Sequence, residues 1–431
     1  MEKIKVVWIC HFSNQQIRKR IPLSKLHFSN LLRRLVGKPA FNYHDFAPWV
    51  TNLIKEFEKF NDVELHVIAP HYGLIRYTSE FELNGVYYHF FKPDLPLLFV
   101  NFPERLCLRV NRFLVKRYLK VIKPDIVNLI GAENAYYSIT SLEIKTIPVY
   151  VSAQTVYSNP LRKMHSGSVV KLNWYTELKI HRKEQYFGCA GRMHRDLILG
   201  NNPEAIIFKM FFPLERPYCV KEVSKIFDFV FFAAGVTKKK GIEEAINALA
   251  LVKKQKHGVT LNVVGKFSSD YKTTIQQKII SLNLEDNISF NDYFPIHADM
   301  HQHLKKARFA LLPNKLDVIS GTVIEAIFLE LPVVTFKTSG TPYLNKDGEI
   351  VLLADIGNEE KLAENMLRLL NEPQLGFQMK RDAKAFVERE FDNTASAKRL
   401  LSNYKAVINH YHHNIPIPKE QLFSTDEFPI Y

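Results

Sequence analysis

The sequence predicts an α/β protein that contains two doubly wound, Rossmann-like domains. Short β-branched and aromatic runs alternate with longer helical patterns, and such alternation is typical of parallel strands joined by crossover helices. The alternation occurs in two separate blocks, and 431 residues are enough for two to three domains of about 150 residues each. Between the blocks, Pro213 and Pro217 interrupt the periodicity. We therefore expect two domains that each carry a parallel sheet covered on both faces.

The first block, residues 1–212, is expected to form the N-terminal domain. Apolar runs rich in Val and Ile predict its strands at residues 4–10, 63–69, 126–130 and 147–152. Apolar residues with helical spacing predict helices at residues 47–60 and 102–122. Residues 213–226 are then expected to form a linker.

The second block, residues 227–395, repeats the alternation and is expected to form the C-terminal domain. Its strand patterns lie at residues 227–234, 260–264, 288–290, 309–312 and 332–336. Its helical patterns lie at residues 242–255, 271–282, 301–307 and 321–328. The last helical pattern, residues 395–411, leads into a C-terminal segment of residues 396–431, which we expect to pack back toward the N-terminal domain.

The composition excludes several classes of protein. Hydrophobic residues make up 46% of the chain and charged residues 24%, a balance that excludes a disordered, collagen-like or coiled-coil protein. No run approaches the roughly 18 apolar residues needed to cross a bilayer, and no small-residue cleavage site follows the first strand, so we expect neither a membrane span nor a signal peptide. Scattered cysteines indicate reduced thiols and a cytoplasmic location. These cysteines are Cys10, Cys107, Cys189 and Cys219.

The positive charge of the chain is concentrated in its first half. Residues 1–200 contain 29 Lys and Arg against 16 Asp and Glu, a net charge of +13, whereas residues 201–431 contain 29 against 28, a net charge of +1. Such an asymmetry indicates an anionic partner, with a membrane surface, a phosphorylated lipid and nucleic acid as the alternatives. A solvated basic surface without any partner is the simpler explanation.

Two basic segments of this half have the pattern of helices that lie on an anionic bilayer. One is a stripe on the helix 102–122, made of Arg105, Arg109, Arg112, Lys116 and Lys120. Its inward face is expected to contain Leu106, Val110, Phe113, Leu114 and Ile122. The other is a cluster of Arg18, Lys19, Arg20, Lys25, Arg33, Arg34 and Lys38 among apolar residues. We therefore expect peripheral attachment to the inner face of the cell membrane, with a solvated outer helix face as the alternative. Nucleic acid is not an expected partner, because no recognition-helix motif or aromatic stacking platform accompanies the charges.

An acidic, glycine-containing segment in the second block carries the strongest chemical signal. Asp317 precedes a turn at Gly321, and Glu325 lies in the first turn of the helix that follows. The unpaired N–H groups of Gly321, Thr322 and Val323 are suited to hold a phosphate, and a carboxylate one turn further along is suited to the hydroxyl groups of an attached ribose. From spacing alone, Thr322 and Glu325 equally fit a capping box that only closes the helix.

Residues 317–335 resemble the E-x7-E segment of the retaining GT-B glycosyltransferases, specifically glycosyltransferase family 4. Flanking segments resemble further family motifs in the same order, and together they span roughly residues 227–395. These segments are a phosphate-binding loop at 231–241, a strand and turn at 261–265, a strand at 307–313 and a loop at 339–342. The resemblance implies a GT-B fold, in which two doubly wound Rossmann-like domains face a cleft and the C-terminal domain holds most of a nucleotide-sugar donor.

The N-terminal half resembles the same family more weakly. Residues 123–133 resemble the strand that ends beside the cleft, and residues 191–196 resemble a motif of bacterial surface-polysaccharide members. The residues that the resemblance assigns to the acceptor or sugar side are Asn14, Glu133, Gln154 and Arg192.

The resemblance also implies a role for each residue of the donor site. Glu325 is expected to bind the ribose hydroxyls, Asp317 to contact the donor sugar, and Lys240 to meet the diphosphate. Lys238 is a further candidate for the diphosphate, because Val236 stands where the family usually has Arg; three lysines in a row equally fit a solvated surface. Asp317, Lys240 and Lys238 are thus the catalytic candidates. The other donor-binding candidates are Ser320, Gly321, Thr322, Val323, Gly235, Thr237 and Gly265.

We expect neither a metal ion nor a cofactor. The chain contains no Asp-x-Asp pair, and His11, His71 and His194 lack metal-ligand spacing. Fixed cations and helix dipoles are then expected to stabilise the charge that develops on the leaving diphosphate.

The predicted function is transfer of a sugar, with retention of configuration, in surface polysaccharide biosynthesis. The expected donor is a nucleotide-diphosphate sugar, and the expected acceptor is a growing glycan or a polyprenyl-diphosphate-linked sugar. The alternatives are a nucleotide-sugar epimerase or hydrolase on the same fold and a non-catalytic GT-B scaffold. A nucleic-acid-binding protein is a less favoured alternative.

Overall fold

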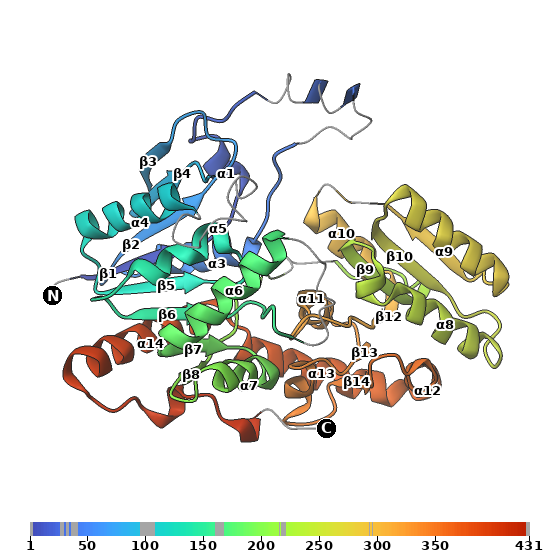
Figure 1. The fold of residues 1–431 in the computed structure, drawn as a ribbon. Coiled ribbons are helices and arrows are strands. Elements are labelled where there is room, and N and C mark those ends of the chain that lie inside the picture. Colours follow the sequence, from blue (N-terminus) through green and yellow to red (C-terminus); the bar gives the residue numbers. More distant parts are fainter. Residues whose placement is uncertain are drawn as a thin grey trace. The chain divides into compact units, whose positions relative to one another are not determined.

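The computed structural model describes residues 3–25, 30–31, 34–35, 42–94, 108–159, 168–214, 216, 221–292, 294 and 296–427 (Figure 1). The chain forms two compact units. The N-terminal unit comprises Met1–Pro213 and Asn393–Phe423, and the C-terminal unit comprises Leu214–Asp392 and Ser424–Tyr431. Within the described ranges, every helix is too short or too polar to span a bilayer.

The N-terminal unit is built on an eight-stranded sheet in the order β3-β4-β2-β1-β5-β6-β7-β8. Its strands are β1 (Ile4–Ile9), β2 (Val63–Pro70), β3 (Thr78–Leu83), β4 (Val86–Phe91), β5 (Ile126–Ile130), β6 (Val149–Ser152), β7 (Tyr186–Cys189) and β8 (Ile206–Lys209). All neighbouring strands are parallel except β3 and β4. The carboxyl ends of the parallel strands therefore meet at one edge of the sheet.

The antiparallel hairpin of β3 and β4 was not predicted from the sequence. Asn84 and Gly85 form its turn, with φ angles of 54° and 77°. An Asn-Gly pair between two strand runs is a strong hairpin signal, because both residues adopt positive φ at little cost. The hairpin adds an antiparallel edge to an otherwise parallel sheet, and its opposite residues Phe81 and Tyr88 stack with ring centroids 5.0 Å apart.

Helices cover both faces of this sheet. They are α1 (Gln15–Arg18), α3 (Pro48–Phe57), α4 (Arg109–Ile122), α5 (Ala135–Ser138), α6 (Ser168–Lys183), α7 (Arg192–Asn201) and α14 (Asn393–His413). Helices α3 and α14 share one core with the strands: the Phe57 ring lies 4.8 Å from Trp8 and 6.2 Å from Tyr404. The Tyr404 hydroxyl also accepts a hydrogen bond from Asn128 of β5 at 2.6 Å. The late helix α14 is thus a structural part of the N-terminal unit.

The C-terminal unit contains a six-stranded parallel sheet in the order β11-β10-β9-β12-β13-β14. Its strands are β9 (Phe227–Gly235), β10 (Leu261–Lys266), β11 (Ile288–Asn291), β12 (Ala307–Leu312), β13 (Val333–Phe336) and β14 (Val351–Ala354). Its helices are α8 (Ile242–Lys253), α9 (Ser269–Ser281), α10 (His297–Leu304), α11 (Gly321–Phe328), α12 (Glu359–Asn371) and α13 (Pro373–Glu390). The predicted α/β class, with two Rossmann-like domains, is confirmed.

Each sheet contains one point at which the order of its strands reverses. In the N-terminal unit the chain passes from β1 to β2 on one side and later returns to β5 on the other side of β1. In the C-terminal unit it passes from β9 to β10 and returns to β12 on the other side of β9. Doubly wound proteins bind ligands outside the carboxyl ends of the strands at such a point. The loops after β9 and β12, and after β1 and β5, are therefore the places to examine.

Candidate functional site

Two loops of the C-terminal unit meet at the carboxyl ends of β9 and β12. After β9 the chain enters a short 3-10 helix, η4 (Lys238–Lys240), and Gly241 then leads into α8. After β12 it passes through a loop that ends at Ser320, the N-cap of α11. The sequence therefore brings the predicted phosphate loop and the predicted acidic segment to the same end of two adjacent strands.

Gly241 allows these two loops to approach each other closely. Its φ is +81°, and a Cβ at this position would lie 1.9 Å from the carbonyl oxygen of Pro313. Any other residue would be strained there and would push the β12 loop away. The Lys315 N–H also donates to the Lys239 carbonyl at 3.2 Å, so backbone contacts tie the loops together.

Lys240 and Asp317 form an ion pair across the two loops. The Lys240 Nζ lies 2.7 Å from Oδ2 of Asp317, and both side chains are partly exposed, at 33% and 39%. The same Oδ2 also accepts hydrogen bonds from Asn314 Nδ2 and from the Ser320 hydroxyl. Within the described residues, every hydrogen bond of the carboxylate is thus made by one oxygen, and Oδ1 has no partner. The structure brings together the two groups that the sequence assigned to the diphosphate and to the sugar.

A third loop supports the acidic segment from behind. The Thr338 hydroxyl donates to the Val318 carbonyl at 2.6 Å, and the Gly340 N–H donates to the same oxygen at 3.0 Å. Because Val318 follows Asp317 directly, these bonds fix the backbone that carries the carboxylate.

The first turn of α11 offers unpaired backbone donors. Val323 N–H bonds the Ser320 carbonyl at 3.0 Å, whereas the N–H groups of Gly321 and Thr322 make no hydrogen bond within the described residues. A Cβ on Gly321 would only touch Leu214 at 3.5 Å, so space remains above the helix end. The capping-box alternative is not realised, because Ser320 is the N-cap and makes no side-chain capping bond.

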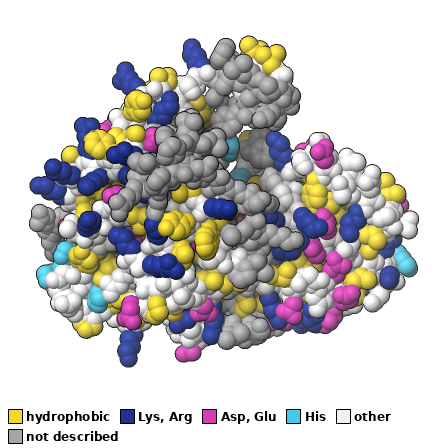
Figure 2. Space-filling model, viewed as in Figure 1, with side chains coloured by type: hydrophobic (Ala, Val, Ile, Leu, Met, Phe, Trp, Pro, Cys, Tyr) yellow, Lys and Arg dark blue, Asp and Glu magenta, His cyan; other side chains and the backbone are white. Residues whose placement is uncertain are grey.

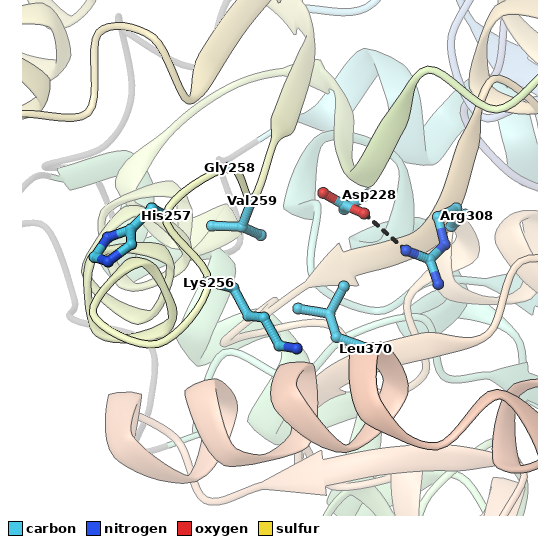
Figure 3. A pocket seen from close by; sticks show the side chains of 7 residues that line it. All are labelled: Asp228, Lys256, His257, Gly258, Val259, Arg308 and Leu370. Carbon is cyan, nitrogen blue, oxygen red and sulfur yellow. Dashed lines mark hydrogen bonds and ion pairs between the residues drawn. The ribbon is translucent and has the colours of Figure 1, made fainter.

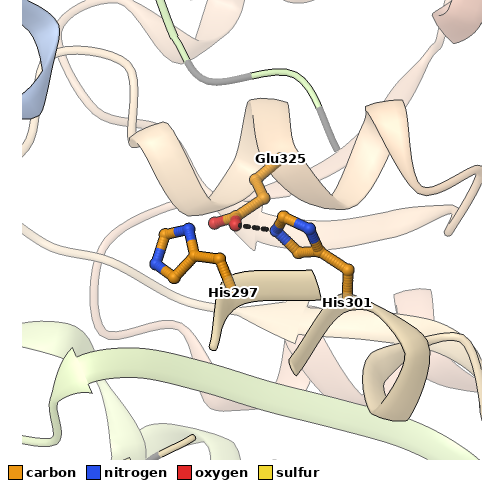
Figure 4. Close-up of side chains that lie close together, drawn as sticks. All are labelled: His297, His301 and Glu325. Carbon is orange, nitrogen blue, oxygen red and sulfur yellow. Dashed lines mark hydrogen bonds and ion pairs between the residues drawn. The ribbon is translucent and has the colours of Figure 1, made fainter. Parts of the chain in front are cut away.

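Glu325 instead faces a histidine of α10 (Figure 4). Its Oε1 lies 2.6 Å from Nε2 of His301, a residue that is 1% exposed. His297, one turn earlier on α10, is exposed and contributes a ring whose ligand atom lies within 4.8 Å of the other two. The sequence analysis missed this cluster, although two histidines four residues apart in a helical pattern are a readable signal.

The remaining donor-site candidates have different surroundings. Gly235 ends β9 with open space around it, and Thr237 is the N-cap of η4. Gly265 has φ +143°, and its Cβ would lie 2.0 Å from the Ala233 carbonyl, so strand packing alone requires glycine there. Lys238 is 71% exposed and lies 3.4 Å from Glu243. Val236 is 2% exposed in the core, so that position does not face a ligand.

A cavity in this unit lies at the other end of the sheet (Figure 3). It is lined by Asp228, Lys256, His257, Gly258, Val259, Arg308 and Leu370. Asp228 and Arg308 stand near the amino ends of β9 and β12 and form an ion pair at 3.0 Å. Because ligands of doubly wound sheets bind at the carboxyl ends, we assign this cavity no part in the site.

The acceptor-side candidates of the N-terminal unit occupy several loops. Asn14 is the N-cap of α1 and accepts from the Ile17 N–H at 2.9 Å, so it has a structural role already. Glu133 is buried after β5, and Gln154 is half-buried after β6. Arg192 begins α7 after β7 and lies 3.7 Å from Asp196. Each therefore follows a strand at the carboxyl edge of the sheet.

Aromatic and imidazole groups fill the switch point of this sheet. His11 follows β1, and its Nδ1 is hydrogen-bonded to the Tyr136 hydroxyl of α5. Burial lowers the pKa of His11 to about 3, and the charge of His71 contributes in the same direction. Burial also lowers the pKa of His71, which follows β2, to about 4, with a contribution from Arg18. Both imidazoles are therefore neutral near pH 7.

The outer face of α4 mixes basic and apolar side chains. Its exposed residues are Arg109, Val110, Phe113, Lys116, Arg117, Lys120 and Val121. The expectation that Val110 and Phe113 face inward was wrong: Phe113 is 65% exposed, because the buried side is formed by the positions 111, 114, 115, 118, 119 and 122. Arg112 leaves the predicted stripe and pairs with Glu143 at 2.9 Å. Figure 2 shows Lys and Arg side chains interspersed with hydrophobic ones over the N-terminal unit.

Parts of the predicted basic surface lie outside the described residues. These are Arg33, Lys38, Arg105 and the neighbouring Leu106. Two of the four cysteines, Cys107 and Cys219, also lie outside the described residues. Of the second basic cluster, Arg18 pairs with Asp45 and donates to the Ser13 hydroxyl. Cys10 and Cys189 are buried free thiols.

Comparison with known proteins finds a similarity to glycosyltransferases in the C-terminal unit. Residues 222–386 match the family model described as glycosyl transferases group 1. The amylovoran biosynthesis glycosyltransferase AmsK of Erwinia amylovora is 26% identical over 219 residues, which cover 49% of this chain and 51% of that protein. The capsular polysaccharide biosynthesis glycosyltransferase CapM of Staphylococcus aureus is 23% identical over 186 residues, covering 41% and 46%. The chain thus spans about half the length of the curated relatives it matches.

Comparison with solved structures supports the fold over nearly the whole chain. HepE of Anabaena, solved in complex with UDP-glucose, has a TM-score of 0.63 at 14% identity and covers 93% of this chain and 99% of its own. At this identity the likeness concerns the fold alone, and it agrees with the GT-B class of two Rossmann-like domains.

Proposed function

We propose that this protein is a glycosyltransferase that takes a sugar from a nucleoside diphosphate sugar. One observation carries the proposal: a cation, two carboxylates and a helix N-terminus gather at the switch point of the C-terminal sheet. They are Lys240, Asp317, Glu325 and the first turn of α11. The diphosphate of such a donor needs a positive field. The hydroxyl groups of its sugar and of its ribose each need a hydrogen-bond acceptor. The glycosyl transferases group 1 match over residues 222–386 supports the same conclusion.

The diphosphate is held by Lys240 and by the free N–H groups of Gly321 and Thr322. The positive end of the α11 dipole favours an anion at this point, and within the described residues these two amides donate no hydrogen bond. The Lys240 ammonium has three N–H donors, so it contacts the diphosphate while it keeps its bond to Asp317. Asp317 in turn has Oδ1 left for a hydroxyl of the donor sugar.

The same groups act on the bond that breaks. When the bond between the sugar's anomeric carbon and the diphosphate oxygen lengthens, negative charge grows on the diphosphate. Preorganised donors aimed at developing charge lower the barrier more than they favour the ground state. Lys240 and the α11 amides supply these donors without a metal ion, in line with the missing Asp-x-Asp pair. Retention of configuration is the outcome that we infer from the resemblance to the retaining family.

The nucleoside is held by Glu325, whose carboxylate accepts hydrogen bonds from the ribose hydroxyls. We take uridine as the first base to test, because a solved structural neighbour binds UDP-glucose. Polysaccharide biosynthesis is the process named for two relatives, which favours a glycan or a lipid-linked glycan as the acceptor.

The N-terminal unit is proposed to carry the acceptor and to bind the membrane surface. The outer face of α4 presents cations beside exposed Phe113 and Val121 and, among its described residues, no acid. A basic face with apolar side chains binds anionic headgroups and enters the acyl boundary. An enzyme with this surface is suited to a polyprenyl-diphosphate-linked acceptor.

Thermal melting with nucleotides tests the donor site. UDP, GDP, ADP, dTDP and CMP are added to wild type and to Glu325→Ala, with Glu349→Ala as a control on an exposed carboxylate that pairs with Arg368. One ligand at about 100 times its dissociation constant adds about 2.7 kcal/mol of stability to the wild type and the control, and far less to Glu325→Ala. If no nucleotide shifts the wild type, the donor proposal fails. Product formation with and without a glycan acceptor then separates transfer from hydrolysis or epimerisation.

A further inference from the structure

A buried histidine contacts the carboxylate that we assign to the ribose. His301 is 1% exposed, and its Nε2 lies 2.6 Å from Oε1 of Glu325, whose side chain is 18% exposed (Figure 4). The two residues come from different helices, α10 and α11. No role for His301 follows from the donor chemistry described so far.

The surroundings of the ring fix its proton. Nδ1 of His301 is buried and has no hydrogen-bond partner among the described residues, whereas Nε2 faces a carboxylate oxygen. A buried N–H without an acceptor costs more than a buried lone pair on an aromatic nitrogen, and a neutral imidazole carries one N–H. The proton therefore belongs on Nε2, which donates it to Oε1.

This donor leaves the other carboxylate oxygen available. Oε2 of Glu325 has no hydrogen bond within the described residues, and the hydrogen bond from His301 restricts the rotation of the flexible glutamate side chain. We propose that His301 is a positioning residue that orients Glu325 so that Oε2 accepts the ribose hydroxyls. The inference rests on the proposed function. It adds that the hydrogen bond from His301 raises nucleotide affinity, because Glu325 is already ordered before the nucleotide binds.

The same three side chains raise the alternative of a transition-metal site. The ligand atoms of His297, His301 and Glu325 lie within 4.8 Å of one another, and imidazole with carboxylate is a donor set that Zn²⁺ accepts. A metal on Nε2 of His301 moves the proton to Nδ1, where a metal-bound histidine normally donates to an acceptor. Among the described residues Nδ1 has none. The hydrogen-bonded pair therefore satisfies the buried ring better than a metal does.

A pair of substitutions separates the donor from the bulk of the side chain. His301→Gln keeps an N–H near the position of Nε2, and His301→Leu fills the space without a donor. Each is compared with wild type for UDP affinity by calorimetry and for its melting midpoint without ligand. We expect His301→Leu to bind UDP about tenfold more weakly than wild type, because this variant loses a hydrogen bond to a charged group. His301→Gln keeps that bond and should stay within about threefold of wild type.

A ligand without the ribose hydroxyls provides the matched control. Wild type and His301→Leu are expected to bind 2′,3′-dideoxy-UDP equally, because orientation of Glu325 matters only when hydroxyls are present. If His301→Leu weakens the binding of UDP and of 2′,3′-dideoxy-UDP equally, the inference is overturned. It is also overturned if UDP affinity across the variants correlates with the melting midpoint and not with the presence of an N–H donor at position 301.

Two further results distinguish this inference from its premise. If Glu325→Ala abolishes UDP binding while His301→Leu leaves it unchanged, the inference fails and the proposed function stands. If Glu325→Ala has no effect on UDP binding, the proposed donor site fails and takes the inference with it. Stoichiometric zinc in the purified protein that is lost in His297→Ala also overturns the inference, because the pair is then a metal ligand set.

Discussion

The two units use the switch points of their sheets in opposite ways. In the C-terminal unit the loops after β9 and β12 present charged groups that keep a third of their surface exposed, Lys240 at 33% and Asp317 at 39%. In the N-terminal unit the loops after β1 and β2 hold two imidazoles, the half-buried His11 and the buried His71, and desolvation lowers the pKa of both so that they stay neutral. The carboxyl edge therefore carries an exposed ion pair in one unit, whereas in the other unit the loops after β1 and β2 carry neutral imidazoles beside aromatic rings.

Under the proposed function, the two edges suit different halves of the reaction. A diphosphate carries its charge into and out of the site, so it needs cations and backbone donors that solvent does not fully screen. A sugar hydroxyl is neutral, and neutral imidazole or phenol groups hydrogen-bond it without a charge to desolvate. Substitutions at the two edges should therefore change different properties of the protein.

The largest effect is expected at Lys240. Lys240→Met removes the cation that faces the diphosphate, and we expect kcat/KM for release of the nucleoside diphosphate to fall about 10²–10³-fold, the range found when one transition-state donor is removed. Lys238→Met should cost less than tenfold, because this side chain is 71% exposed and pairs with Glu243. Lys256→Met, near the amino ends of the strands, is the matched control. Equal losses for Lys240 and Lys256 would contradict the charged-edge assignment.

A smaller effect is expected from pH at the neutral edge. The pKa of His11 is about 3 in the folded protein against 6.5 as its ordinary value, so protonation favours the unfolded chain. The contribution of His11 to stability is complete above pH 6.5 and is lost as the pH falls toward 3. One pKa unit corresponds to about 1.4 kcal/mol, so acidification from pH 6.5 to pH 5 should lower the free energy of unfolding by about 2 kcal/mol through this group.

Calorimetry of His11→Gln measures this contribution. The variant should lose less stability than wild type between pH 6.5 and pH 5, because Gln does not titrate. A pH profile that His11→Gln leaves unchanged would show that the neutral edge depends on other groups.

Sequence patterns predicted the C-terminal unit better than the N-terminal one, and the reason is local. Its strands and helices alternate from β9 to β13. The acidic segment falls at the N-terminus of α11, where a short run of residues supplies both backbone donors and a carboxylate. The pairing of Lys240 with Asp317 was not predicted, because these residues lie 77 positions apart in the sequence. Their two loops meet only because Gly241 allows a close approach. Distances of that kind are set by strand order, which spacing does not encode.

The N-terminal predictions failed where burial, not periodicity, decides the role of a residue. The stripe on α4 was assigned by counting basic residues, but Arg112 turns to Glu143 while Phe113 turns outward. The Asn-Gly hairpin of β3 and β4 was present as a readable turn signal and was overlooked. The role of His301 was not predicted for another reason. It depends on a contact with Glu325, 24 residues away, and the sequence of neither helix indicates that contact.

The smallest effect is expected on the outer face of α4, where the comparison of the units extends to their surfaces. Wild type should bind vesicles that contain phosphatidylglycerol and should release them as salt rises. Lys120→Ala removes one exposed cation worth about 1 kcal/mol near an anionic surface, so the dissociation constant should rise about fivefold in low salt. Phe113→Ser should weaken binding at high salt as well, because an apolar contact is not screened. Lys254→Ala in the C-terminal unit, where basic and acidic residues nearly balance, should change nothing. If wild type ignores anionic vesicles, or if Lys254→Ala weakens binding as much as Lys120→Ala, the excess charge of the first half is only a solvated surface.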